Sequence, residues 1–189
     1  MANVKEPKYS VKVHDDRFEV REYAPRVVAE TVVVGDWNGA GNEGFRRLAG
    51  YIFGKNKGRS KIAMTAPVAQ RSEAEPVKLA MTAPVGQRQD GSAWTVAFTM
   101  PEGETLATLP VPEDPRVVLR EAPGASVAVV KFRGRWTPAN MEEQRMALRE
   151  WLTARGLEPE GSSEVNRYDP PWVPWFMRRN EIWQPVRSN

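Results

Sequence analysis

Hydrophobic and polar positions divide the chain into strands and two helices. One segment repeats apolar residues at i, i+3, i+4 and i+7, which is the spacing of a helix that packs on one side. These residues are Phe45, Leu48, Ala49 and Ile52. The apolar face of a second predicted helix consists of Met141, Leu148, Trp151 and Leu152. Gly54 and Gly156 are placed to end the two helices.

Segments with alternating or β-branched residues predict the strands. They are residues 9–14, 27–34, 61–70, 77–87, 93–100, 127–132, 162–168 and 180–186. Residues 101–115 contain four prolines and are predicted to be a connecting loop. Helices that alternate with hairpin-linked strands indicate the α+β class, with a mostly antiparallel sheet, curved or closed, and both helices outside it.

The chain contains a duplication with an offset of 99 residues. VRE at 20–22 recurs as LRE at 119–121, and GDWN at 35–38 recurs as GRWT at 134–137. Asn38 and Thr137, which follow the two tryptophans, are predicted to cap the helices. We therefore expect a single domain over residues 9–187, built from duplicated β-α-β halves at about 9–100 and 116–187.

A second repeat lies inside the first half. KIAMTAPV at 61–68 recurs as KLAMTAPV at 78–85, and alternation places Met64 and Met81 on matching faces of a predicted hairpin. Methionine is soft and adaptable, so this face either lines a ligand site or fills the core. Three glycines in the first helix, Gly39, Gly41 and Gly44, indicate either a loose start or a close approach of another backbone.

Composition excludes several kinds of site. The 189 residues include no cysteine and one histidine, which removes disulfides, thiolate metal sites, cysteine nucleophiles and any site that needs two imidazoles of one chain. The net charge of +3 is too small and too evenly spread to indicate nucleic-acid binding. No apolar run reaches the roughly 18 residues of a membrane span. We expect a cytoplasmic monomer that has no membrane span and binds no nucleic acid.

Enzyme motifs such as GxSxG, a Walker loop and HExxH are absent from the sequence. His14 falls on the polar face of an alternating strand, which favours a solvated histidine over a metal ligand. The basic loop at 55–61 is either a turn in solvent or a partner for a carboxylate or phosphate.

The segment at 167–181 is the most unusual in the chain. Its prolines stiffen the backbone around four aromatic residues, which can form a rigid apolar wall. The four are Tyr168, Trp172, Trp175 and Phe176, and Arg178 and Arg179 follow them. This wall either covers a flat apolar ligand or closes one end of a barrel.

Four segments of the chain resemble the SOUL/haem-binding-protein family. They are FEVREY, FGKNKGRSKIAMTAPV, VAVVKFRGRW and RYDPPWVPWFMRRNEIW, and the resemblance extends from about Tyr9 to Val186. It implies a distorted antiparallel β-barrel flanked by two helices, which is also similar to the effector-binding domains of gyrase-inhibitor-type regulators. It further implies non-covalent binding of haem or an iron-free porphyrin, a small planar apolar ligand with carboxylates.

The resemblance also implies which residues hold the macrocycle. In this sequence they are Phe45, Arg46, Ala49, Ile52, Met64, Tyr168, Trp172, Val173, Trp175 and Arg178. Val173 stands where an animal member has a basic residue, and the histidine proposed as an axial ligand in some members has no equivalent. The expected function is a non-enzymatic tetrapyrrole carrier or buffer that uses a hydrophobic surface pocket.

Two other functions remain open from the sequence. A small-molecule hydrolase or effector-binding protein of the related fold would need a carboxylate with a raised pKa, for which Glu181 and Glu22 are the candidates. A protein-interaction module would expose Trp172 and Trp175 as a docking patch.

Overall fold

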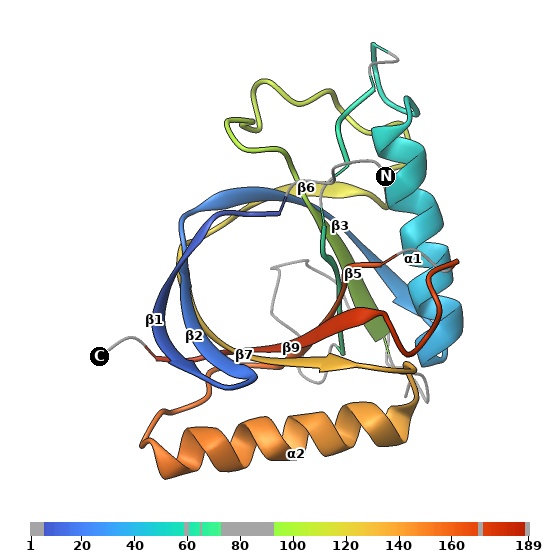
Figure 1. Ribbon diagram of the computed structural model, residues 1–189. Coiled ribbons are helices and arrows are strands. Elements are labelled where there is room, and N and C mark those ends of the chain that lie inside the picture. The colour runs from blue at the N-terminus through green and yellow to red at the C-terminus, as the bar shows by residue number, and fades with distance from the viewer. Residues whose placement is uncertain (1–5, 59–60, 65, 73–92, 170–171, 188–189) are drawn as a thin grey trace, which may run out of the picture.

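The computed structural model describes residues 6–58, 61–64, 66–72, 93–169 and 172–187 (Figure 1). The strands are β1 (Tyr9–Asp15), β2 (Phe18–Tyr23), β3 (Arg26–Val34), β4 (Val68–Ser72), β5 (Ala93–Thr99), β6 (Val118–Ala122), β7 (Ala125–Arg133), β8 (Glu164–Arg167) and β9 (Arg179–Pro185). The helices are α1 (Trp37–Ile52) and α2 (Pro138–Ala154). All described strands belong to one sheet.

The order of the strands in the sheet is symmetric. It runs β1-β2-β7-β9-β8-β4-β5-β3-β6, and every neighbouring pair is antiparallel. When β1 is left out, exchanging β2 with β6, β3 with β7, β4 with β8 and β5 with β9 gives the same order read in reverse. The repeated VRE and LRE motifs lie in the exchanged strands β2 and β6. The sheet is therefore built from two equivalent sets of strands, and β1 is an addition at one edge.

Two corners curl this sheet into a distorted barrel. Only two residues separate β2 from β3, and two separate β6 from β7. Tyr23 at the end of β2 pairs with Ala125, while Arg26 at the start of β3 pairs with Ala122. The two corners thus lie against each other, and the ribbon closes into a ring (Figure 1). The predicted antiparallel barrel with two outer helices is confirmed.

The apolar cores lie between the outside of the ring and the helices. Helix α1 packs on β3 and β5, and α2 packs on β7 and β9. The core under α1 includes Leu48, Tyr51, Ile52, Val96 and Phe98. The core under α2 includes Val20, Val130, Leu148, Leu152 and Ile182. Since a strand that packs under a helix buries one set of alternate side chains there, its other set points into the ring.

Helix α1 begins one residue before its expected cap. Asp36 is the N-cap, with extended backbone, and its Oδ1 accepts a hydrogen bond of 2.8 Å from the Gly39 amide. The prediction of Asn38 as cap was wrong, because an aspartate two residues earlier already satisfies the first free amide. Thr137 caps α2 as predicted, by accepting from the Asn140 amide.

The strand predicted at 61–70 begins only at Val68, as β4. Ile62 and Met64 instead pack against the core under α1, so the methionine contributes to that core. The other arm of the predicted hairpin, 77–87 with Met81, lies outside the described residues. Strand β1 is an edge strand and is exposed along its whole length, on its apolar face as well.

The glycines of α1 allow the helix to approach the sheet closely. A Cβ atom on Gly44 would lie 2.4 Å from Val96 Cγ2 of β5, and one on Gly41 would lie 2.7 Å from Gln70 Oε1 of β4. Both distances are shorter than van der Waals contact. Of the two explanations for the glycines at the start of α1, the structure therefore supports close approach of the helix to the sheet.

Replacing Gly44 with alanine should destabilise the protein by about 1–3 kcal/mol, because the new methyl group overlaps a buried valine and one of the two elements must shift. Gly50→Ala is the matched control on the same helix: its Cβ would meet only the Lys55 side chain, at 3.2 Å, and that chain can move. Denaturant unfolding of both variants measures the difference. Equal stabilities would contradict the close approach.

Candidate functional site

A buried ion pair lies inside the ring. Arg21 of β2 donates to Glu181 of β9 from both terminal nitrogens, at 2.8 and 3.0 Å, and its Nε donates to Glu19 at 2.8 Å. The Arg21 and Glu181 side chains are fully buried. The Tyr9 ring of β1 covers the guanidinium at 4.3 Å. This pair connects β2 and β9, which are not neighbours, across β7.

Further donors converge on Glu181. The Tyr168 hydroxyl, the Trp183 indole and Arg179 donate to its two oxygens at 2.6, 2.7 and 2.9 Å. Burial alone would favour the protonated acid, but the hydrogen bonds and charge of Arg21, together with the other donors, outweigh it and lower the pKa of Glu181 to about 2. Glu181 is therefore a permanently ionised structural group.

Glu181 and Glu22 are the two carboxylates that a hydrolase of this fold was expected to use. The expected raised pKa of Glu181 was wrong, because the desolvation of the carboxylate is offset by surrounding donors. Glu22 is the neighbour of Arg21 on β2, but it faces solvent and pairs with Lys12 at 3.1 Å. Neither carboxylate is a base held in an apolar cleft.

The same network orients the Tyr168 side chain. Its hydroxyl bonds to Glu181, and the Arg179 guanidinium lies 3.9 Å from the centre of its ring. Burial, with the nearby Glu181 charge, raises the pKa of the Tyr168 hydroxyl and keeps it neutral. Tyr168 thus joins the interior network, at the point where the chain leaves β8.

The rest of this aromatic loop, residues 172–178 between β8 and β9, presents apolar side chains to solvent. Trp172 is 81% exposed and Trp175 is 46% exposed, and Phe176 and Met177 are also exposed. Trp175 packs edge-to-face on Phe176 with ring centres 5.7 Å apart, and Arg135 lies over its ring at 4.9 Å. The loop is therefore an ordered aromatic surface that lacks an apolar cover within the described residues.

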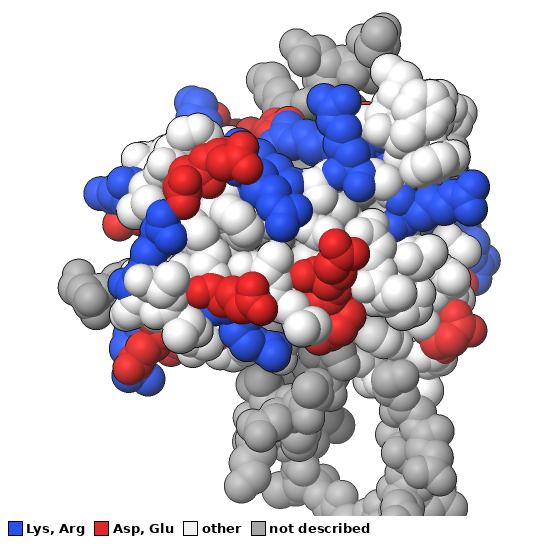
Figure 2. All heavy atoms as spheres, turned by 60° about the horizontal axis from the view of Figure 1, so that its bottom comes forward, with Lys and Arg blue, Asp and Glu red and all other residues white. Residues whose placement is uncertain are grey.

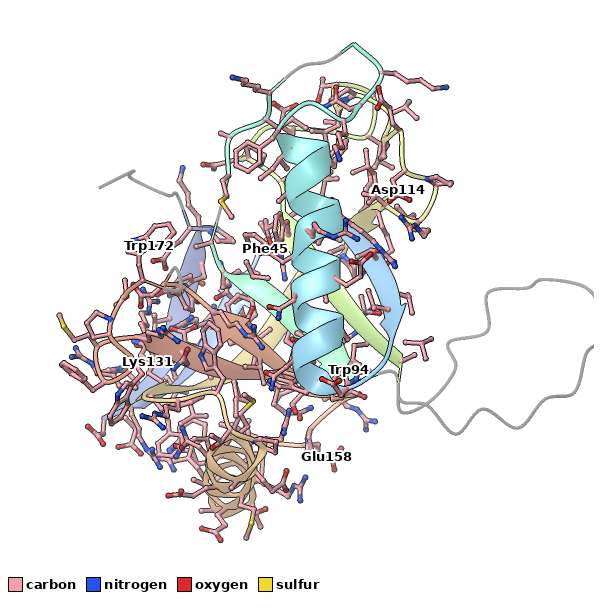
Figure 3. The ribbon with its side chains drawn as sticks, turned by 90° about the vertical axis from the view of Figure 1, so that its right-hand side faces the viewer. Phe45, Trp94, Asp114, Lys131, Glu158 and Trp172 are labelled. Atoms are coloured by element: carbon pink, nitrogen blue, oxygen red, sulfur yellow. The ribbon has the colours of Figure 1, made fainter. Side chains whose placement is uncertain are left out.

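Helix α1 contributes to the same side of the molecule. Phe45 is 41% exposed and packs edge-to-face on Phe98 of β5. In Figure 3, Phe45 lies beside α1, on the side of the helix where Trp172 is also found. We call Phe45, Trp172, Trp175 and Phe176 the aromatic surface.

The other residues that the resemblance implied lie around this surface or beneath it. Arg46 is exposed and pairs with Glu43 one turn earlier, at 2.5 Å. Arg178 donates from Nε to the Val173 carbonyl at 2.7 Å, which braces the aromatic loop from within. Ala49 is half-buried on α1, and Met64 is half-buried nearby in the core. Ile52 is fully buried and presents nothing to solvent.

The single histidine lies far from the aromatic surface. His14 is on β1, across the ring from α1 (Figure 1). Its side chain is 63% exposed, and its Nδ1 lies 3.2 Å from Glu19 Oε1. His14 is exposed, as predicted, but a bulge between Val11 and Val13 places it beside Glu19, whereas Lys12 pairs with Glu22 on the opposite face. Every residue of β1 is exposed, so the alternation did not decide this.

Cavities in the described residues are small. One of about 30 Å³ lies beneath α2, next to Leu148 and Leu152, and one of about 60 Å³ lies inside the ring. Neither is lined by a residue of the aromatic surface. Neither of these two cavities is large enough to hold a macrocycle.

The surface carries charges of both signs. On the face that Figure 2 shows, basic and acidic side chains are interspersed over white uncharged atoms. Neither helix in the described part of the chain is long and apolar enough to cross a membrane.

The chain is similar to known proteins in sequence and in fold. The profile of the "SOUL heme-binding protein" family matches residues 4–185. The chain is 30% identical to human heme-binding protein 2 over 179 residues, covering 91% of this chain and 82% of that protein. A 57-residue segment is 44% identical to the mouse protein of that name, covering 30% of this chain and 28% of the mouse protein. The EcmrR C-terminal domain has a similar fold, with a TM-score of 0.63 at 13% identity, covering 96% of this chain and 99% of that one.

Glu181→Gln should lower the free energy of unfolding by about 3–5 kcal/mol near pH 7, because it leaves Arg21 buried without its full partner. The ionised carboxyl contributes its stability above its ordinary pKa of 4.5 and loses it as the pH falls toward 2. The difference in the free energy of unfolding between wild type and variant should therefore become smaller as the pH falls from 4.5 toward 2. Urea unfolding measures it.

Glu22→Gln is the matched control, since it removes a carboxylate one position from Arg21 that faces solvent. It should change stability by less than about 1 kcal/mol. A Glu181→Gln gap that stays constant between pH 5 and pH 2 would contradict the lowered pKa.

Proposed function

Since the chain belongs to the SOUL haem-binding protein family, we propose that it binds haem or another tetrapyrrole non-covalently on the aromatic surface, as a carrier or buffer and not as an enzyme. The observation that supports this site is the exposure of Trp172 and Phe45 on one side of the fold (Figure 3). Exposed aromatic residues that gather on one side of a protein are typical of a binding site.

The residues of the surface fit a flat apolar ligand. Indole and phenyl faces gain contact area at a small entropic cost because they have few rotatable bonds. Burying about 300 Å² of a macrocycle at ~25 cal/mol/Å² contributes at most about 7 kcal/mol before the cost of association. The exposed guanidinium of Arg46 is the cation on α1 that could orient a propionate, at about 0.2–1 kcal/mol for an exposed pair.

Iron coordination has a minor role in this proposal. His14 lies across the ring, and the Tyr168 hydroxyl is held neutral by its bond to Glu181. Flat contact would then supply most of the affinity, in the micromolar range. We therefore propose that iron-free protoporphyrin binds about as tightly as haem. A cytoplasmic location and a monomeric state are part of the same proposal.

The exposure of Trp172 also supports a second function, in which the aromatic loop docks on another protein. The hydrolase alternative has no such support, because Glu181 and Glu22 lack the required setting. Titration with porphyrin distinguishes the two supported functions. Only the first predicts saturable binding of a free macrocycle.

Trp172→Ala and Phe45→Ala should each weaken haem and protoporphyrin binding by about tenfold, equivalent to about 1.4 kcal/mol, because each removes an exposed aromatic face from the proposed site. Soret absorbance and tryptophan quenching measure the dissociation constants. Met146→Ala is the control, since Met146 is an equally exposed apolar residue on α2. The proposed site is overturned if all three variants bind like wild type.

His14→Ala should leave the haem dissociation constant and the Soret maximum unchanged, because His14 lies on the opposite side of the barrel from the aromatic surface. The measurement is the same absorbance titration, run side by side with wild type. A blue-shifted Soret band together with weaker binding in the variant would show that this imidazole is a ligand.

A further inference from the structure

The larger of the two cavities lies inside the ring, next to the Arg21 network, and Trp183 belongs to both. Its volume is about 60 Å³. The polar and aromatic side chains that line it are Arg26, Arg71, Arg120, Glu164, Asn166 and Trp183. They come from β3, β4, β6, β8 and β9, so the sheet supplies the polar lining of the cavity, and Pro67 before β4 also lines it.

Two polar groups in this cavity have no hydrogen-bond partner among the described residues. The Nε and Nη1 atoms of Arg26 are buried without an acceptor, and Asn166 Oδ1 is buried without a donor. The Arg26 guanidinium lies 5.0 Å from the centre of the Tyr23 ring. Burial lowers its pKa, and the charge of Glu164 offsets part of this effect. An arginine remains charged in proteins, so buried N–H donors of this kind require an acceptor.

Arg26 differs from the other two arginines that line the cavity. Arg120 donates to Glu30 at 2.9 and 3.0 Å, and Arg71 lies 3.9 Å from the same carboxylate. Both therefore have a carboxylate partner, whereas the Nε and Nη1 atoms of Arg26 have no acceptor among the described residues.

The two copies of the duplication differ at this point. Arg21 and Arg120 are equivalent at the 99-residue offset, and both point into the ring. Arg21 is fully buried against Glu181 and Glu19, which fill its half. In the other half, Arg120 is occupied by Glu30, while Arg26 faces open volume. Arg21 therefore has acceptors for its N–H groups in one half, whereas Arg26 in the other half has buried N–H groups without an acceptor among the described residues.

We propose that this cavity binds a small carboxylate anion, whose oxygens accept from the Arg26 guanidinium. A volume of about 60 Å³ accommodates an anion of a few heavy atoms, since roughly 10–15 Å³ of cavity volume in this measure holds one water. It is too small for a macrocycle. The site is therefore separate from the aromatic surface, and its ligand class does not depend on the proposed tetrapyrrole function.

Acetate titration of the full-length chain tests the proposal. The experiment follows the arginine Nε–Hε signals by 1H–15N NMR at constant ionic strength, with the Arg26 signal assigned from its loss in Arg26→Met. We expect a saturable shift of this signal and a rise in melting temperature with acetate. Formate should act similarly, whereas benzoate, which exceeds the cavity, should have no saturable effect.

Arg26→Met keeps most of the length of the side chain and removes its charge. It should weaken acetate binding at least tenfold and, without acetate, melt at or above the wild-type temperature, because a buried unpaired charge is gone. Arg133→Met, at an exposed position on β7, should retain acetate binding. Haem titration should be unchanged in both variants.

The proposal is overturned by an Arg26 signal that does not respond to acetate, or by a response equal in Arg26→Met and wild type. The same applies if benzoate acts like acetate, since binding would then not be limited by the cavity. The size series needs no variant, so it remains informative should Arg26→Met fail to fold.

Discussion

The Arg21–Glu181 ion pair is the constraint around which this barrel is organised. Two opposite charges without solvent exposure are tolerable only when each is surrounded by partners, and here Glu19, Tyr168 and Trp183 supply them. These partners come from different strands and from the start of the aromatic loop. The ion pair therefore fixes the spacing of strands β2 and β9 and also the point from which the loop extends.

This arrangement separates apolar from charged contacts. Apolar packing holds the helices to the outside of the ring, whereas the inside holds the charged pairs beside a small cluster of Tyr23, Val127, Val129 and Trp183. The aromatic loop lies outside, and the residues at its two ends, Tyr168 and Arg179, both donate to Glu181. Substitution of the exposed Trp172 is therefore not expected to disturb the network that holds the barrel together.

The sequence predicted the architecture better than the site. The duplication, both helices and the Thr137 cap depended on local patterns, which survive folding. The interior network was missed because both faces of β2 are buried, one under α2 and one in the ring, and alternation cannot tell which buried face is polar. The arginine repeated at 21 and 120 was the available signal. Glu181 was misjudged because its pKa depends on distant donors such as Arg21.

The interlocked corners have a consequence for how such a chain could arise. The bent strand β2–β3 of one half pairs with β6–β7 of the other, and neither bent strand pairs with itself. A half-length ancestor would therefore have had open hydrogen-bonding edges that only another copy could satisfy. Fusion of two such copies into one gene would join a former homodimer, after which each half is free to diverge, one toward structural rigidity and the other toward ligand chemistry.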